Sequence, residues 1–264
     1  MRLLAREEPE SSALVADVFR REGIELHTGV SADRVREEGG QIEVTLSDGA
    51  VVAAERLLVA IGRRTNLASL QLQTAGLDPH AGLIAVDDRL RTAVPGIWAI
   101  GDITGHGAFT HISLYQADIA CNDILGVDAP GADYRAVPRV TFTDPEVGSV
   151  GLTEAQARDK GLTVRTGIAD ISKTARGWIH KAGNDGLIKL VEDADRGVLV
   201  GASSVGPCGG EVLSMLMVAV HAEVPVSKLC TMITAYPTWH RGLEDALRDL
   251  KAMTSPQSAR DCPP

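Results

Sequence analysis

The sequence is poor in aromatic residues, in cysteine and in positive charge, and each shortage excludes a class of protein. Aromatic residues make up 3% of the 264 residues, so the stacking platforms used to bind single-stranded nucleic acid are not expected. Acidic residues outnumber basic ones by 35 to 26, and the net charge of −9 disfavours a nucleic-acid or anionic-membrane surface. We therefore expect neither a nucleic-acid partner nor a membrane partner.

The cysteines are too few and too widely spaced for a disulfide scaffold or a zinc ribbon. No CxxC pair occurs among Cys121, Cys208, Cys230 and Cys262. The most apolar stretch, residues 212–220, is too short to span a bilayer, and the first residues contain no signal-peptide apolar region. These observations predict a protein of the reducing cytoplasm.

The fingerprints of self-sufficient nucleotide enzymes and of common hydrolases are also missing. The chain contains no G-x-G-x-x-G, no P-loop, no H-E-x-x-H and no G-x-S-x-G. An enzyme that binds its nucleotide without help should show at least one of these patterns. We therefore expect the functional residues in segments without these patterns.

The first part of the chain has the pattern of a nucleotide-binding α/β domain. Apolar residues at helical spacing after Pro9 predict a helix that ends at Gly23. Alternating residues predict a strand at 24–28 and a three-strand meander within 35–52. The apolar run at 56–62 is typical of a strand that is buried on both faces of a parallel sheet.

The second part begins with a short buried strand at 97–102, which a Gly-rich loop and a helix over about 113–125 follow. From residue 137 onward strands come first and helices later, and this order predicts an α+β domain. Thr153 and Gln156 fit a capping box at the start of a helix. The expected strands lie near 140–142, 147–151, 163–170, 186–191 and 198–204, and the closing helices near 209–221, 226–231 and 241–252.

Several segments in a fixed order carry a family resemblance. They are 60–66 (AIGRRTN), 94–102 (VPGIWAIGD), 138–147 (PRVTFTDPEV) and 186–190 (GLIKL). Together they resemble the C-terminal part of the flavin-dependent pyridine nucleotide–disulfide oxidoreductases, which include dihydrolipoamide dehydrogenase, glutathione reductase and mercuric reductase. The resemblance covers nearly the whole chain, from about residue 2 to residue 252.

The resemblance implies remnants of three-layer α/β domains for NAD(P) and FAD, followed by an α+β dimerisation domain. Residues 1–90 correspond to part of the NAD(P)H-binding domain, 91–130 to the last segment of the FAD-binding domain, 136–253 to the dimerisation domain and 254–264 to a flexible tail. It also implies FAD and NAD(P)H as cofactors, with incomplete sites in this chain, and a homodimer through residues 136–253. Because the family's fingerprints and redox-active cysteine pair lie upstream, the chain looks like the C-terminal half of a longer enzyme that begins at an internal methionine. A separate N-terminal half is the alternative source of the missing parts.

Three positions follow from the resemblance as candidates for flavin contact. Gly101 and Asp102 match a Gly-Asp motif whose aspartate binds the ribityl chain of the flavin in relatives. The next helix aims its N-terminus at the flavin in relatives, so His111 either contacts the flavin or is an ordinary helix-entry residue. Gly62 is a further cofactor-binding candidate, because Arg63 beside it either approaches a cofactor phosphate or lies in solvent.

The segment 235–244 (AYPTWHRGLE) carries the acid–base candidates. Dithiol-using relatives have a His directly before Pro-Thr and a Glu five residues after that His, and here these positions hold Tyr236 and Arg241. The standard dyad is missing, so ordinary lipoamide or glutathione turnover is in doubt. Either His240 and Glu244 replace the dyad, or they form a surface pair one helical turn apart. Tyr236 itself either serves as a proton donor or substrate contact, or packs at the interface.

The electron acceptor is the least defined part of the resemblance. Mercuric reductases have a Tyr at the position of Tyr236, and they end in vicinal cysteines that pass on Hg(II). This chain has Cys262 alone at that distance, and a lone thiolate chelates Hg(II) poorly. The resemblance implies a FAD-dependent NAD(P)H oxidoreductase that passes electrons through flavin to a disulfide, a metal ion or another acceptor. The alternative is a non-catalytic dimerisation module, or one half of a split flavoenzyme.

Overall fold

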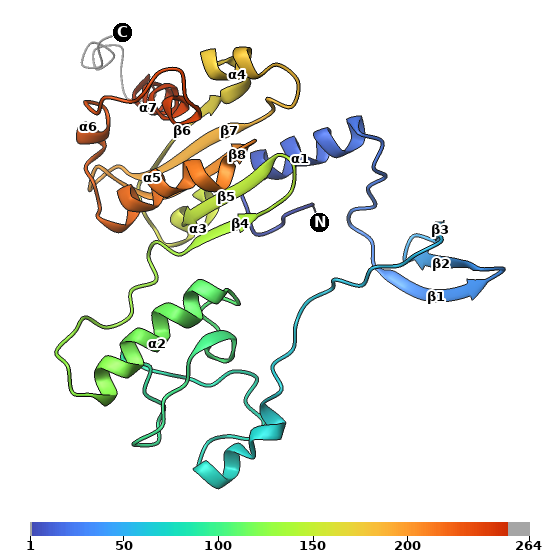
Figure 1. The fold of residues 1–264 in the computed structure, drawn as a ribbon, viewed down its shortest axis with the longest axis vertical. Coiled ribbons are helices and arrows are strands. Elements are labelled where there is room, and N and C mark those ends of the chain that lie inside the picture. Colours follow the sequence, from blue (N-terminus) through green and yellow to red (C-terminus); the bar gives the residue numbers. More distant parts are fainter. Residues whose placement is uncertain (1, 253–264) are drawn as a thin grey trace. The chain divides into compact units, whose positions relative to one another are not determined.

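The computed structural model describes residues 2–252, and its contacts divide the chain into two compact units (Figure 1). The first unit contains the residues up to Leu57 together with those from Arg135 onward, and the second contains residues 58–134. Each unit has buried hydrophobic clusters of its own. The two units therefore fold around different sets of residues.

A five-stranded antiparallel sheet is the centre of the first unit. Its strand order is β4-β5-β8-β7-β6, and each strand lies where the sequence predicts one. The strands are β4 (Pro138–Thr141), β5 (Glu146–Gly151), β6 (Val164–Asp170), β7 (Leu187–Asp193) and β8 (Val198–Gly206).

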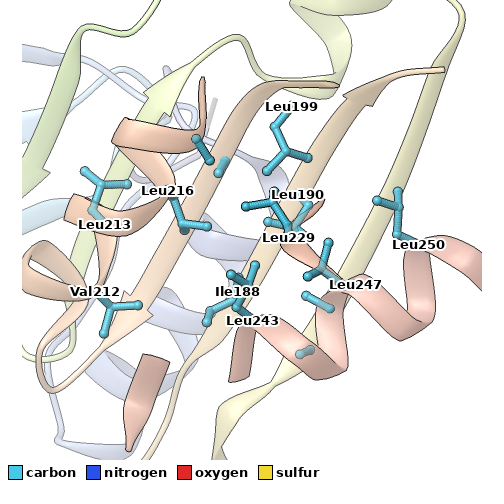
Figure 2. Close-up of a cluster of buried hydrophobic side chains, with 14 of the residues drawn as sticks. Ile188, Leu190, Leu199, Val212, Leu213, Leu216, Leu229, Leu243, Leu247 and Leu250 are labelled. Carbon is cyan, nitrogen blue, oxygen red and sulfur yellow. The ribbon is translucent and has the colours of Figure 1, made fainter. Parts of the chain in front are cut away.

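Two longer helices cover one face of this sheet. α5 (Gly209–His221) packs on β5 and β8, and α7 (Gly242–Ala252) packs on β6 and β7, with the short α6 (Val226–Leu229) between them in the chain. Figure 2 shows the leucines of these helices gathered around Ile188 and Leu190 of β7. Strands followed by helices confirm the predicted α+β arrangement.

The contact between α7 and β6 depends on a glycine. A Cβ placed on Gly167 would lie 2.2 Å from the carbonyl oxygen of Ala246. No larger residue fits there unless the helix moves away from the sheet. The sequence thus sets how closely this helix approaches the strand.

The other face of the sheet carries α1 (Pro9–Arg21), whose Val15 packs with Val147, Leu187 and Val205. Successive residues of a strand point to opposite faces, so Leu187 and Lys189 face α1 while Ile188 and Leu190 face α5 and α7. The sheet therefore lies between two helical layers.

Lys189 is a buried charged residue beneath α1, with 4% of its side chain exposed. Its Nζ donates hydrogen bonds to Glu8 at 3.0 Å, Glu10 at 2.8 Å and Glu154 at 3.0 Å. Burial acts to lower the pKa of Lys189, but the bonds to these three carboxylates outweigh it and raise that pKa. The ammonium group stays charged and fastens α1 to the sheet.

The remaining elements of the first unit are short. α3 (Glu154–Asp159) begins with the predicted capping box, in which Thr153 accepts from the Gln156 N–H and the Gln156 side chain accepts from the Thr153 N–H. α4 (Ala175–His180) follows a 3-10 turn at Ile171–Lys173. The predicted meander is confirmed as β1 (Ala32–Glu38), β2 (Gln41–Leu46) and β3 (Val51–Ala54).

The second unit has one long helix, α2 (Thr110–Ile124), and three 3-10 turns at Leu67–Leu70, Leu72–Ala75 and Gly101–Thr104. Its buried clusters are small. One contains Leu67, Leu72, Ile84 and Ala99, and the other contains Leu90, Ile119 and Ala120.

Three predicted strands are wrong in this structure. Residues 24–28 and 56–62 have no regular secondary structure, and 97–102 contains no strand, only an isolated bridge from Trp98 to Arg91 and the start of the 3-10 turn Gly101–Thr104. A strand is stable when neighbouring strands pair with its backbone N–H and C=O groups. Within residues 2–252 no strand pairs with 56–62, so Leu58 and Ile61 remain 89% and 94% exposed.

Candidate functional site

The Gly-Asp motif is held by a buried glutamine that the sequence analysis missed. Gln116 is 0% exposed, and its Oε1 accepts a hydrogen bond from the Gly101 N–H at 2.6 Å. Its Nε2 donates to the Thr104 hydroxyl at 3.0 Å and to the Tyr134 hydroxyl at 2.8 Å. Burial raises the pKa of Tyr134 above its ordinary value. Gln116 thereby fixes the segment that presents Asp102.

The backbone at Gly101 adds a second constraint. Its φ is +80°, and a Cβ there would lie 3.0 Å from Ser113 Oγ. A left-handed backbone that also lies against a helix favours glycine. The Gly in Gly-Asp is therefore required by the geometry of the turn that leads into α2.

Asp102 lies on a partly open surface, with 34% of its side chain exposed. Its Oδ2 is 3.0 Å from Nη1 of Arg63, so the structure brings together two positions that the sequence singled out separately. Gly62 has a φ of +129°, and a Cβ added there would meet no atom within 4 Å. Gly62 therefore lies in open space, and only its backbone conformation favours glycine.

The start of α2 faces this segment with its positive end. The helix begins at Thr110, and the N-cap residue Phe109 makes no side-chain capping bond. The rings of Phe109 and His111 stack with centroids 5.1 Å apart. An uncapped helix N-terminus stabilises negative charge, so this end of α2 suits an anionic or electron-rich group.

The second candidate cluster does not form the predicted acid–base pair. Glu244 accepts hydrogen bonds from Thr234 and from Nη1 of Arg241 at 3.1 Å, and Arg248 lies at 3.5 Å. In the described part of the chain none of its bonds comes from His240, which is exposed in the turn Trp239–Arg241. Glu244 is therefore occupied by arginines and does not orient His240.

Tyr236 is 67% exposed. The guanidinium of Arg241 lies over its ring, 5.3 Å from the centroid. Arg241 lies where dithiol-using relatives have Glu, and Tyr236 lies where they have His. The first of these residues thus covers the second. The pair can bind an electron-rich or anionic group, but it lacks a carboxylate to take up a proton.

The metal candidate Cys262 lies outside the described residues. Within residues 2–252 no group of three or more histidine, cysteine or acidic side chains is placed to hold a metal ion. In the same range no helix has both the length and the apolar character that a membrane span needs.

Comparison with known proteins identifies the class. Residues 1–117 match the family model described as pyridine nucleotide-disulphide oxidoreductase, and residues 137–247 match the dimerisation domain of that family. The chain belongs to the pyridine nucleotide-disulphide oxidoreductase family. The expected fold class, remnants of α/β nucleotide-binding domains followed by an α+β dimerisation domain, is confirmed.

The relatives include two enzyme types that the residue patterns suggested. The chain is 36% identical over 243 residues to a mercuric reductase of Streptomyces lividans, covering 90% of this chain and 50% of that protein. It is 32% identical over 240 residues to a dihydrolipoyl dehydrogenase of Geobacillus stearothermophilus, covering 89% and 51%. The HOCl-induced flavoprotein disulfide reductase RclA of Escherichia coli superposes with a TM-score of 0.82 at 30% identity, covering 92% of this chain and 56% of that one. The chain thus spans about half the length of the relatives it matches.

Proposed function

We propose that this chain provides the dimerisation domain and part of the FAD-binding site of a flavin-dependent NAD(P)H oxidoreductase. The observation that carries the proposal is the Gly101–Asp102 turn, which Gln116 holds before the uncapped start of α2. A carboxylate that accepts hydrogen bonds from hydroxyl groups and a helix N-terminus that favours negative charge suit a flavin and its polyhydroxy chain. Membership of the family supports the same cofactor.

The residues fit FAD better than they fit NAD(P)H. Asp102 and the N-terminus of α2, near His111, would hold FAD, which supplies two-electron transfer when it is bound. The sequence has no G-x-G-x-x-G pattern, and Gly62 lies in an irregular, exposed segment. Nicotinamide binding therefore requires groups beyond those that these residues offer.

The acceptor side of the proposal rests on Tyr236 and His240. We place Tyr236 as a substrate contact, because it is exposed and covered on one face by Arg241. His240 is left as the exposed acid–base group, without Glu244 as its orienting partner. A disulfide, a metal ion or another acceptor would receive the electrons in a cytoplasmic homodimer that assembles through residues 136–253, and Cys262 remains the candidate metal ligand.

The alternative is a non-catalytic dimerisation module or one half of a split flavoenzyme. The occupied carboxylate of Glu244 favours it, since no acid–base dyad is formed. The exposed run at 57–61 favours it too, because such a run suits pairing with strands of a second polypeptide.

One reconstitution experiment separates the catalytic and split-enzyme functions from the non-catalytic dimerisation module. The chain is mixed with FAD and with the separately expressed half of the Streptomyces lividans mercuric reductase that it does not match. The proposal expects flavin absorbance to copurify with the mixture, and NAD(P)H to be oxidised when Hg(II) or a disulfide is added. Light scattering on the chain alone tests the homodimer.

Asp102→Ala, with Asp118→Ala as control on the exposed side of α2, tests the flavin contact. Loss of one charge-assisted hydrogen bond should weaken flavin retention on the order of tenfold, and the control should not. If no mixture retains flavin, the catalytic and split-enzyme functions are both wrong and the dimerisation module stands.

A further inference from the structure

Two basic residues of α4, Arg176 and His180, lie against one buried tryptophan. The guanidinium of Arg176 is 5.6 Å from the ring centroid of Trp239, and the His180 ring meets the same indole edge-on at 5.3 Å. Trp239 is 8% exposed and belongs to the main hydrophobic core. Arg176 and His180 are therefore anchored at the surface by a ring that cannot move freely.

The positive charge at this place is not neutralised. Among residues 2–252 no carboxylate forms an ion pair with Arg176 or with Lys181, whereas nearby Lys173 pairs with Asp170 at 3.1 Å and Arg241 with Glu244 at 3.1 Å. Arg176 is also half-buried, so its charge is less screened than that of a fully exposed arginine. Lys181 projects from an unusual backbone with a φ of +68° directly after α4.

The local charge contrasts with the chain as a whole. The sequence has a net charge of −9, so most of its surface repels anions. A small positive area on an acidic protein concentrates anionic ligands there and rejects them elsewhere.

The aromatic residues at this surface further restrict the chemical class of the ligand. The segment that contains Trp239 also contains Tyr236, whose exposed ring already lies under the Arg241 guanidinium at 5.3 Å. Planar guanidinium groups stack on conjugated rings and bind carboxylate or sulfonate through paired N–H donors. A ligand that offers both a conjugated ring and an anionic group would use both properties.

We propose that the surface made by Arg176, His180 and Lys181 with the segment Tyr236–Arg241 is a binding site for a planar aromatic anion. We name this surface the α4 site. The proposal identifies the chemical class of the electron acceptor. This assignment rests on the proposed function, because only the proposed enzyme passes electrons to an acceptor. Binding itself requires neither flavin nor a second polypeptide.

The competing explanation is structural. The Arg176 stem covers the edge of Trp239 and its charge simply projects into water. Under that explanation the α4 site does not distinguish an anionic ring from a neutral ring of the same shape.

Isothermal titration of the full chain tests the difference with two anthraquinones that lack a thiol-reactive position. Anthraquinone-2-sulfonate is the anionic probe and 2-(hydroxymethyl)anthraquinone is its neutral match. We expect one site per chain and an affinity on the order of tenfold higher for the sulfonate, decreasing as salt is added. Equal affinity for the two probes, or no binding of either, overturns the proposal.

Arg176→Met keeps the apolar cover on Trp239 and removes the charge. It should lower sulfonate affinity about tenfold while the neutral probe is unchanged. Arg20→Met, which removes an exposed arginine from α1, controls for net charge and should change affinity less than about twofold. An equal loss in both variants shows a general charge effect and overturns the proposal.

Circular dichroism and thermal unfolding check that each variant is folded. If Arg176→Met does not fold, Lys181→Gln at an exposed position replaces it, with an expected loss of about threefold. Because these titrations contain no flavin, a failed reconstitution of turnover leaves their result intact, and a failed titration leaves flavin binding untouched.

Discussion

The five-stranded sheet and the apolar run at 57–61 have similar sequences and opposite outcomes. β7 is apolar over Leu187–Val191 apart from Lys189, and the strand is buried along its whole length. The run Leu57–Ile61 has the same character, yet Leu58 is 89% exposed and Ile61 is 94% exposed. The difference is that β7 has β6 and β8 beside it and helices on both faces, whereas the run has no partner strand in residues 2–252.

The residue pattern alone therefore shows that a segment can form a buried strand. Whether it does so depends on the strands and helices that pack beside it. The first unit contains all the partners of its sheet. The second unit depends on small clusters and on the polar contacts of Gln116. Stability should be concentrated in the first unit, and the variants below test that contrast in order of expected effect.

The largest loss is expected from Lys189→Met. The change leaves the buried carboxylate of Glu8 without its cation, which typically costs about 3–5 kcal/mol. Urea unfolding should be followed by tryptophan fluorescence in a Trp98→Phe background, so that the signal comes from Trp178 and Trp239 of the first unit.

Lys160→Met, which removes an exposed lysine at the end of α3, is the control for Lys189→Met. We expect a change of less than about 0.5 kcal/mol there. A loss under about 1 kcal/mol in Lys189→Met would show that α1 is held by its apolar contacts alone.

The next prediction compares the two apolar regions directly. Leu190→Ala removes a side chain that is 0% exposed, and it should cost about 2–5 kcal/mol. Ile61→Ala removes one that is 94% exposed, and it should change the free energy of unfolding by less than about 0.5 kcal/mol. If both variants lose similar stability, then the run at 57–61 is covered in solution, and binding of an apolar dye to the unmodified chain should be correspondingly low.

The elements predicted correctly are those that follow from local sequence patterns and whose partner segments are all present in the chain. The strands β4–β8, the meander and the Thr153 capping box all depend on residues present in the chain, and all were predicted. The strands at 24–28, 56–62 and 97–102 failed because pairing is a property of neighbours and not of the segment.

The residues of the candidate site also divide into those that the sequence predicted and those that it did not. Asp102 and Tyr236 were found because motifs mark them, but whether they act is still a prediction. Gln116 was missed, although a single glutamine among Ile112, Ile119 and Ala120 on the buried side of α2 is a readable signal. The pairing of Glu244 with Arg241 in place of His240 could not be predicted from the sequence. Arg241 and His240 both lie within about one helical turn of Glu244, and only the structure shows which of them contacts it.

A third prediction probes the second unit through Gln116→Leu. The Gly101 N–H and the hydroxyls of Thr104 and Tyr134 lose their common partner. Unsatisfied buried polar groups should cost about 1–3 kcal/mol, seen as faster amide hydrogen exchange at Gly101 and Thr104. Asn122→Leu, at a half-buried position of the same helix, should leave the exchange unchanged; equal acceleration in both variants would point to α2 as a whole.

The smallest effect is expected at Glu7, which joins the N-terminal segment to the sheet. Arg139 donates to both of its carboxylate oxygens, at 3.1 and 3.0 Å, and the Ser149 hydroxyl donates as well. Burial alone would raise the pKa of Glu7, but these hydrogen bonds and the Arg139 charge outweigh it and hold that pKa below its ordinary value. Glu7→Gln should cost about 1.5 kcal/mol at neutral pH.

The sign of the pH dependence follows from that lowered pKa. A carboxyl group that is more acidic in the folded protein stabilises it above its unfolded pKa of about 4.3, and that contribution is lost as the pH falls through the lower folded pKa. The stability difference between the unmodified chain and Glu7→Gln should therefore be constant from about pH 7 to 5 and shrink below about pH 4. Glu22→Gln, at the exposed end of α1, should match the unmodified chain at every pH. A Glu7→Gln difference that persists undiminished in acid would mean that the amide changes packing, and that the ion pair with Arg139 contributes little to holding the N-terminal segment on the sheet.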